Sequence, residues 1–374
     1  MEALFYWHWF HSLKGIGQKE KEFLLSLCPE VREWFENNLE WGPEEVAGGR
    51  VYSEEQQKRW SEIQMILNDR DQKETARKTY EQIIKQGIRM TARGENDFPE
   101  RLKQVYLSPF VLYYIGELPK DNIPSIGIVG ARNCSIYGEE IAKQFGKSLS
   151  EAGIQIISGM ARGIDGCAQR SAIRERGKSF AVFGSGVDVC YPSEHKDLYV
   201  QLCEHGGVIS EELPGTKPLS HHFPRRNRII AGLSDALFVV EAKEKSGSLI
   251  TVSYALEQGK EIYAVPGRVH DRLADGTNRL IQEGAYLVRE PEDILHNFSK
   301  GNFEILLKSK KNPKLLLETK EKIVYACLSL HPKHVEQISE ETGMELSELA
   351  SVLFGMEMKN EIRQTMKNYY MIQS

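Results

Sequence analysis

From residue 123 onward, short apolar runs alternate with amphipathic stretches. The runs end in glycine or in a small residue, as at 126–129 before Gly130, 154–157 before Ser158-Gly159 and 179–183 before Gly184. Helical periodicity fills the intervals at 141–149 and 168–176. Further short runs follow at 208–210, 236–240 and 262–265. Buried strands separated by helices predict an α/β domain with a doubly wound, Rossmann-like parallel sheet.

The flanking segments follow other patterns. Residues 1–90 favour helices, and the glycine turn at 13–17 is typical either of a helix-hairpin-helix (or SAM-like) domain, whose backbone N–H groups hold a phosphate, or of a plain connection. Residues 91–120 predict an irregular collar with one strand at 111–115. Three helices and a hairpin at 362–372 predict a C-terminal winged helix. We therefore expect domains at 1–90, 91–298 and 315–374, with a basic linker at 299–314.

Composition restricts the class of protein. The chain has 374 residues, of which 41% are hydrophobic and 27% charged, and its net charge is −5. The length fits two or three globular domains, and apolar runs long enough to span a membrane are absent. Without a signal peptide, and with six cysteines but no C-x-x-C pair, a cytoplasmic protein is expected. Any nucleic-acid site in this acidic chain must be local.

The usual enzyme motifs of such sheets are missing. Gly184-Ser185-Gly186 lacks the third glycine of a dinucleotide fingerprint, and the second strand ends without the acidic residue that would hold a ribose. Two G-K-S tripeptides lack the earlier glycine of a phosphate loop, and neither G-x-S-x-G nor H-E-x-x-H occurs. We therefore expect no catalytic residues, no cofactor and no metal.

Small and basic residues gather instead at the turns after the predicted strands. Glycine and serine at helix starts favour anion binding through backbone N–H groups. Between residues 213 and 234 there are four basic residues and no acid, and Phe223 beside them offers a ring for base stacking. A track for single-stranded nucleic acid is the prediction. Its candidate residues are Gly130, Arg132, Ser135, Gly159, Arg162, Gly184, Phe223, Arg225, Arg226, Asn227, Arg228, Gly247 and Ser248.

The motifs GARNCSIYG, SGMARGID, GSGVD, FPRRNRIIAGLS and SGSLIT occur in this order, and the segment 90–295 resembles the DNA-processing protein A family (DprA, also called Smf). The resemblance implies a homodimeric binding protein, not an enzyme, that protects incoming single-stranded DNA during natural transformation and loads the RecA recombinase. It assigns DNA contacts to Arg132, Phe223 and Lys196. It also assigns the dimer interface to Leu280, Ile281 and Leu287. Ser220 departs from the family, whose members often have lysine there.

Two alternatives stay open. A related Rossmann-like enzyme acting on a phosphorylated nucleoside would share the glycine-arginine turns. A regulator of double-stranded DNA would act through the C-terminal domain. That domain carries six basic against nine acidic residues over 315–374, and its expected recognition helix, 347–358, contains Glu348 and Glu357 but no basic residue. We therefore predict that it binds a protein partner rather than DNA.

Overall fold

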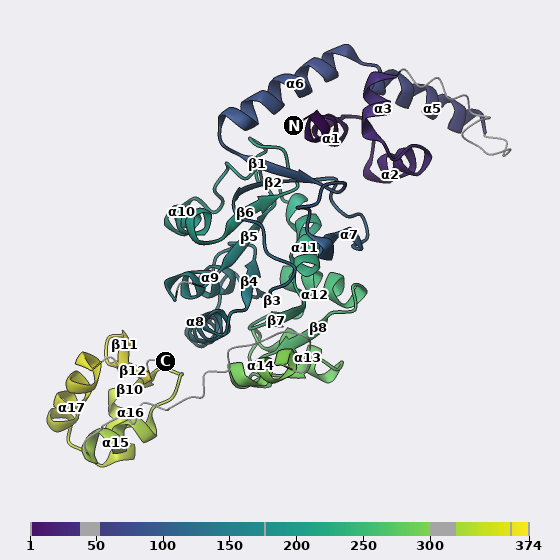
Figure 1. The fold of residues 1–374 in the computed structure, drawn as a ribbon. Coiled ribbons are helices and arrows are strands. Elements are labelled where there is room, and N and C mark those ends of the chain that lie inside the picture. Colours follow the sequence, from purple (N-terminus) through teal and green to yellow (C-terminus); the bar gives the residue numbers. More distant parts are fainter. Residues whose placement is uncertain (1, 38–52, 176, 300–318, 360, 373–374) are drawn as a thin grey trace.

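The computed structural model describes residues 2–37, 53–175, 177–299, 319–359 and 361–372 (Figure 1). Its centre is a nine-stranded sheet in the order β1-β2-β6-β5-β4-β3-β7-β8-β9. The strands are β1 Arg89–Ala92, β2 Val111–Gly116, β3 Ser125–Val129, β4 Gln155–Ser158, β5 Ser179–Phe183, β6 Gly207–Ser210, β7 Ala236–Val239, β8 Glu261–Ala264 and β9 Tyr286–Leu287. From β6 to β9 all neighbours are parallel, so the predicted Rossmann-like sheet is confirmed.

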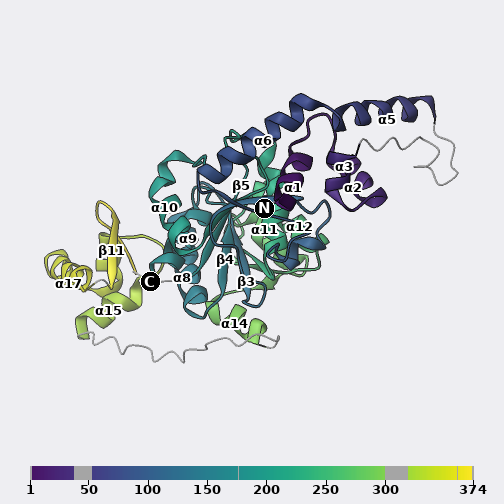
Figure 2. The same ribbon diagram turned by 45° about the horizontal axis from the view of Figure 1, so that its top comes forward.

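Helices cover both faces of this sheet (Figures 1 and 2). On one face lie α8 Ile136–Glu151, α9 Ile164–Arg174 and α10 Lys196–His205, with α14 Pro291–Ser299 against α8. On the other lie α7 Glu100–Lys103, α11 His222–Leu233, α12 Gly247–Glu257 and α13 Asp275–Gln282. A 3-10 turn, η1 Ser193–His195, precedes α10. Each face buries its own apolar cluster, which explains why the strands are apolar on both sides.

The order of the strands places a crevice in the middle of the sheet. The chain runs from β3 outward through β4, β5 and β6, and then returns to β7 on the other side of β3. This reversal between β3 and β7 is the position where open α/β sheets bind ligands, beyond the carboxyl ends of the strands.

The collar expected at 91–120 is more regular than its sequence indicates. β1 and β2 pair with each other antiparallel, and β2 continues the sheet antiparallel to β6. Proline and glycine near these short strands hide their periodicity, so the sequence alone does not predict β1.

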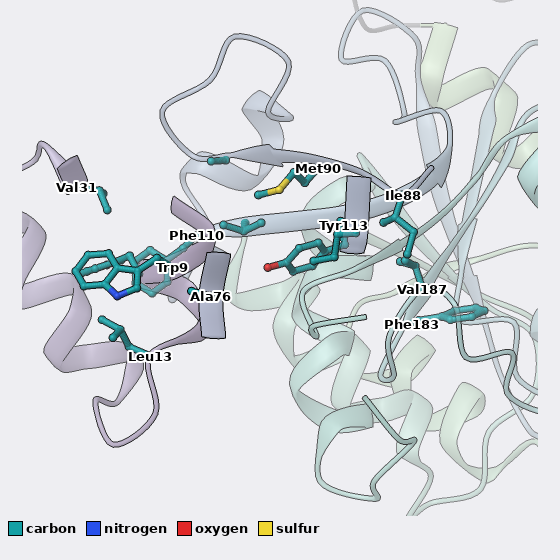
Figure 3. Close-up of a cluster of buried hydrophobic side chains, with 14 of the residues drawn as sticks. Trp9, Leu13, Val31, Ala76, Ile88, Met90, Phe110, Tyr113, Phe183 and Val187 are labelled. Atoms are coloured by element: carbon teal, nitrogen blue, oxygen red, sulfur yellow. The ribbon is translucent and has the colours of Figure 1, made fainter. Parts of the chain in front are cut away.

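The N-terminal helices share a core with this extended edge. They are α1 Glu2–Ser12, α2 Gln18–Leu27, α3 Val31–Glu36, α5 Glu54–Leu67 and α6 Arg70–Lys85. Trp9 of α1 and Leu13 just after it belong to one buried cluster with Phe110, which precedes β2, and Tyr113 of β2 (Figure 3). The buried His8 bonds to the Tyr113 hydroxyl at 2.7 Å, which ties α1 to β2.

The glycine turn at 13–17 is an internal connection. The Gly17 N–H donates to the Glu20 carboxylate at 2.7 Å, and Arg59 bonds both Glu20 and the Gly15 carbonyl. The turn therefore offers its N–H to the protein's own carboxylate, as in the plain-connection interpretation.

The C-terminal segment has the winged-helix order. It comprises α15 Thr319–Cys327, β10 Lys333–His334, α16 Val335–Thr342, α17 Leu346–Met358, β11 Ile362–Met366 and β12 Tyr369–Ile372. The expected hairpin is present, and β10 completes a three-stranded sheet. Arg363 reaches the central domain through an ion pair with Glu140 at 2.6 Å. Apart from Ser299, the basic linker lies outside the described residues. Among the described helices, none has the length and apolar character needed to cross a membrane.

Candidate nucleic-acid interface

A pocket of about 610 Å³ opens at the carboxyl ends of β3, β4 and β7. Gly130 and Arg132 border it after β3, Ala161 after β4, and the segment 243–248 after β7. The start of α11 supplies Phe223, Arg226 and Asn227. Among the candidate residues, those that the structure brings together here are Gly130, Arg132, Phe223, Arg226, Asn227, Gly247 and Ser248.

The exposed Arg132 and the half-buried Phe223 lie next to each other in the pocket. The Arg132 guanidinium lies 5.6 Å from the centroid of the Phe223 ring, and Arg132 makes no ion pair within the described residues. Tyr191 packs beside the same ring, with 5.5 Å between centroids and 39° between planes. A charged fork on an aromatic platform is suited to a phosphate next to a base.

Arg226 supports this platform from beneath. Its side chain is buried, donates to the carbonyls of Gly159 and Val182, and lies 5.9 Å from the Phe223 centroid. Burial lowers the pKa of Arg226 to about 10, while the nearby Asp165 opposes this shift. Arg226 therefore fixes the position of Phe223 and adds positive charge at the floor of the pocket.

Arg228, expected among the phosphate contacts, is a structural residue instead. It is 3% exposed, and its Nη2 bonds both oxygens of the buried Glu211 at 2.7 and 2.8 Å. Arg225, one turn earlier and exposed, lies 3.4 Å from Glu211 and bonds Gln18 of α2. Neighbouring arginines on one helix point to different surroundings, so only Arg225 of this pair is accessible to a phosphate.

The predicted row of helix starts open to anions is mostly filled by the protein. Ser135 caps α8, and both its N–H and its hydroxyl donate to Glu241. The Gly159 N–H donates to Asp165 at 3.1 Å. Gly184 is buried under α11, where its carbonyl meets His222. The start of α12 is different, because Gly247 is exposed to the pocket behind the Ser246 cap.

Two further candidates, Arg162 and Lys196, also lie outside the pocket lining. Arg162 is exposed and pairs with Glu194. Lys196 opens α10, is exposed, and has no ion-pair partner in the part of the chain that the structure describes. A nucleic acid that continues past the pocket toward α10 would reach Lys196 without breaking an existing ion pair.

The pocket also contains residues that sequence reasoning missed. Lys243 and Lys245 are exposed at its rim, make no ion pairs within the described residues, and flank the open start of α12. Their alternation with acids in Glu241-Ala242-Lys243-Glu244-Lys245 makes this segment look like an ordinary solvated loop. Its position directly after a central strand was the available signal. Ser220 also lines the pocket.

The three candidate dimer residues separate in the structure. Leu280 of α13 is buried in the core of its face of the sheet, and Ile281 of the same helix packs against that core. Leu287 is 47% exposed on β9, beside the 49% exposed Tyr286. Of the three, Leu287 is the exposed one and lies at the edge of the sheet, whereas Leu280 is buried and not accessible to a second chain.

Two family models match this chain. Residues 89–299 match the family model described as DNA recombination-mediator protein A. The chain belongs to this family. Residues 308–365 match the winged-helix domain of DprA. The DNA processing protein DprA of Streptococcus pneumoniae is 43% identical over 201 residues, which cover 54% of this chain and 71% of the relative.

Solved structures of the DprA family share the fold. The crystal structure of DprA from Streptococcus pneumoniae aligns with a TM-score of 0.56 and 33% identity, covering 75% of this chain and 98% of that chain. A Helicobacter pylori DprA structure, described by its single-stranded DNA binding mode, aligns with a TM-score of 0.52 and 25% identity over 57% of this chain and 96% of that one.

Proposed function

We propose that this DprA-family protein binds single-stranded DNA through the pocket between β3, β4 and β7. One observation carries the proposal. The Arg132 guanidinium, which has no ion-pair partner among the described residues, lies over the Phe223 ring where the strand order reverses between β3 and β7. Stacking on an aromatic ring does not depend on base identity, and it needs an unpaired base. The site therefore favours single strands over duplexes.

The surrounding cations extend the contact beyond one nucleotide. Lys243 and Lys245 lie at the rim after β7, Arg225 on α11, and Lys196 at the start of α10. Lys196, Lys243 and Lys245 make no ion pair within the described residues, whereas Arg225 lies 3.4 Å from Glu211. These four cations can neutralise successive phosphates.

We infer that the biological role is protection of incoming single-stranded DNA during transformation and its delivery to the RecA recombinase. Membership of the DNA recombination-mediator protein A family supports this role. Homodimerisation through the β9 edge would align two pockets and raise the affinity for longer strands.

Fluorescence anisotropy with a labelled oligothymidylate and a duplex of equal length tests the proposal. We expect tight single-strand binding that weakens steeply with salt, and much weaker duplex binding. A nucleoside-release assay on the same preparation tests the enzymatic alternative. Equal affinity for both DNA forms, or turnover of a phosphorylated nucleoside without single-strand binding, would contradict the proposal.

A further inference from the structure

The first turn of α8 is occupied by a carboxylate from across the sheet. Glu241 follows β7, yet its Oε2 accepts the Ser135 N–H at 2.9 Å and its Oε1 accepts the Ser135 hydroxyl at 2.5 Å. The same hydroxyl oxygen accepts the Gly138 N–H at 3.0 Å. Glu241 therefore engages the N–H and hydroxyl of Ser135, and through that hydroxyl the Gly138 N–H, which are donors that a helix start can offer to a phosphate.

The fit between this carboxylate and the helix is close. Glu241 is 4% exposed, and it makes no ion pair within the described residues. A Cβ at Gly138 would lie 2.4 Å from the Glu241 carboxyl carbon, so glycine is required for this approach. Burial raises the pKa of the Glu241 carboxyl, and the hydrogen bonds from Ser135 oppose this shift. These donors are the groups that would otherwise hold a phosphate.

The turn after β4 also directs an N–H to the protein's own carboxylate. Asp165, in the first turn of α9, is 7% exposed and accepts the Gly159 N–H at 3.1 Å, and this donor lies in the loop before the helix. At the start of α12, by contrast, Gly247 is exposed, and a Cβ at this position would have no described heavy atom within 4 Å. The protein thus fills the anion position at the start of α8 and leaves the one at the start of α12 open.

We propose that Glu241 is a specificity determinant that excludes free phosphate and mononucleotides from the start of α8. A mononucleotide at the first turn of a Rossmann-like sheet needs that position for its phosphate. Because Glu241 fills the start of α8, anions can bind only to exposed groups such as the side chains of Arg132, Lys243 and Lys245. These separate cations suit the spaced phosphates of a strand. The choice of a strand over a mononucleotide rests on the proposed function, whereas the exclusion of phosphate does not.

The test removes the carboxylate and measures binding of inorganic phosphate by calorimetry, without DNA. Glu241→Ala is expected to bind phosphate roughly tenfold more tightly than the wild type, the size of a partly buried helix-start interaction. The matched control is Glu244→Ala, which removes the same charge from an exposed position in the same loop and should leave phosphate affinity near that of the wild type.

A second pair of variants distinguishes three possible causes of a gain in phosphate binding: the emptied position, the removed negative charge and a folding defect. Glu241→Gln keeps the position filled and should bind no more phosphate than Glu244→Ala. Glu241→Ser opens the position while retaining an acceptor for Ser135, and should reproduce the gain if Glu241→Ala fails to fold. The proposal is overturned if the wild type already binds phosphate as tightly as the opened variants, or if Glu241→Gln gains as much as they do. If the wild type does not bind single-stranded DNA, the proposed function is contradicted. The phosphate affinities of the variants would still test the role of Glu241.

Discussion

At the scale of single residues, the pocket combines two interactions with different physical signatures. Arg132 offers a charge whose attraction to a phosphate is weakened by salt, whereas Phe223 offers a face whose stacking on a base is not. The two groups touch each other, with 5.6 Å between the guanidinium and the ring centroid, so affinity alone cannot separate their contributions. Salt dependence can.

We predict that Arg132→Ala lowers single-strand affinity and reduces the slope of log affinity against log salt by about 0.7. Phe223→Ala should cost about 1–3 kcal/mol in binding free energy and leave the slope nearly unchanged. Anisotropy titrations at several salt concentrations measure both quantities. Equal slopes for the two variants would contradict the assigned roles.

The two arginines that share Glu211 should behave oppositely. Arg228→Ala leaves the buried Glu211 without its bidentate partner, so we expect a loss of about 3–5 kcal/mol in the free energy of unfolding. Arg225→Ala, at an exposed position, should cost less than about 1 kcal/mol of stability. It should instead lower DNA affinity and its salt slope. Urea unfolding and DNA titration of both variants check these expectations. If Arg228→Ala is as stable as the wild type but binds DNA weakly, Arg228 contacts DNA after all.

At the scale of elements, the flanking segments relate differently to the sheet. The N-terminal helices share a buried cluster with β1 and β2, so they form one packed unit with that edge. The winged helix meets the central domain through fewer contacts, namely the Arg363–Glu140 pair, the stacking of His331 on Tyr137 and the packing of Leu330 against one buried cluster of the sheet. We therefore expect changes at the N-terminal interface to alter the stability of the central domain. We expect the winged helix to be removable without loss of DNA binding by the central domain.

His8 makes the N-terminal attachment sensitive to acid. Burial lowers the pKa of His8 from 6.5 to about 4, so the folded state holds it neutral while the unfolded chain gains a proton. Stability should therefore fall as the pH drops from 6.5 toward 4, by on the order of 3 kcal/mol from this group. Urea unfolding at pH 7 and pH 5 should show a smaller loss for His8→Gln, whose side chain does not titrate. An identical loss in both proteins would assign the acid sensitivity elsewhere.

The winged helix should contribute little to single-strand binding. Its α17 is acidic at Glu348 and Glu357, and it exposes Phe354 and Met358, which suits a protein partner better than phosphates. Truncation after Asn312 should leave single-strand affinity within about threefold of that of the full chain. A loss of roughly a hundredfold would show instead that this domain reads DNA.

At the scale of the whole molecule, the sheet ends in an uncovered apolar strand. β9 carries Tyr286 and Leu287, both about half exposed, at one edge of the nine-stranded sheet. An exposed apolar edge strand favours association with another chain. For a binding protein with one small pocket per chain, a symmetric pair would lengthen the DNA track.

We predict that Leu287→Asp yields a monomer with weaker binding to long single strands and unchanged binding to short ones. Val200→Asp on α10 is the matched control, because Val200 is 46% exposed and lies far along the sheet from β9. Sedimentation velocity at micromolar concentration reads the outcome. A wild type that sediments as a monomer would refute the dimer.

The sequence by itself determined the parallel strands β3 to β8 and the family. Alternation of short apolar runs with helical periodicity is local information, and it predicted the parallel strands because buried strands must be apolar on both faces. The motifs that follow each strand likewise lie within a few residues, so GARNCSIYG and FPRRNRIIAGLS placed Arg132 and Phe223 at one edge of the sheet.

Only the tertiary structure decided which polar groups face the ligand. Arg225 and Arg228 look equivalent in sequence, but Glu211, 17 residues before Arg228, buries one of them in an ion pair. Ser135 looks open to a phosphate until Glu241, 106 residues away, fills the same position. Such pairings depend on how distant segments pack, and side-chain burial over these separations has no periodicity for the sequence to reveal.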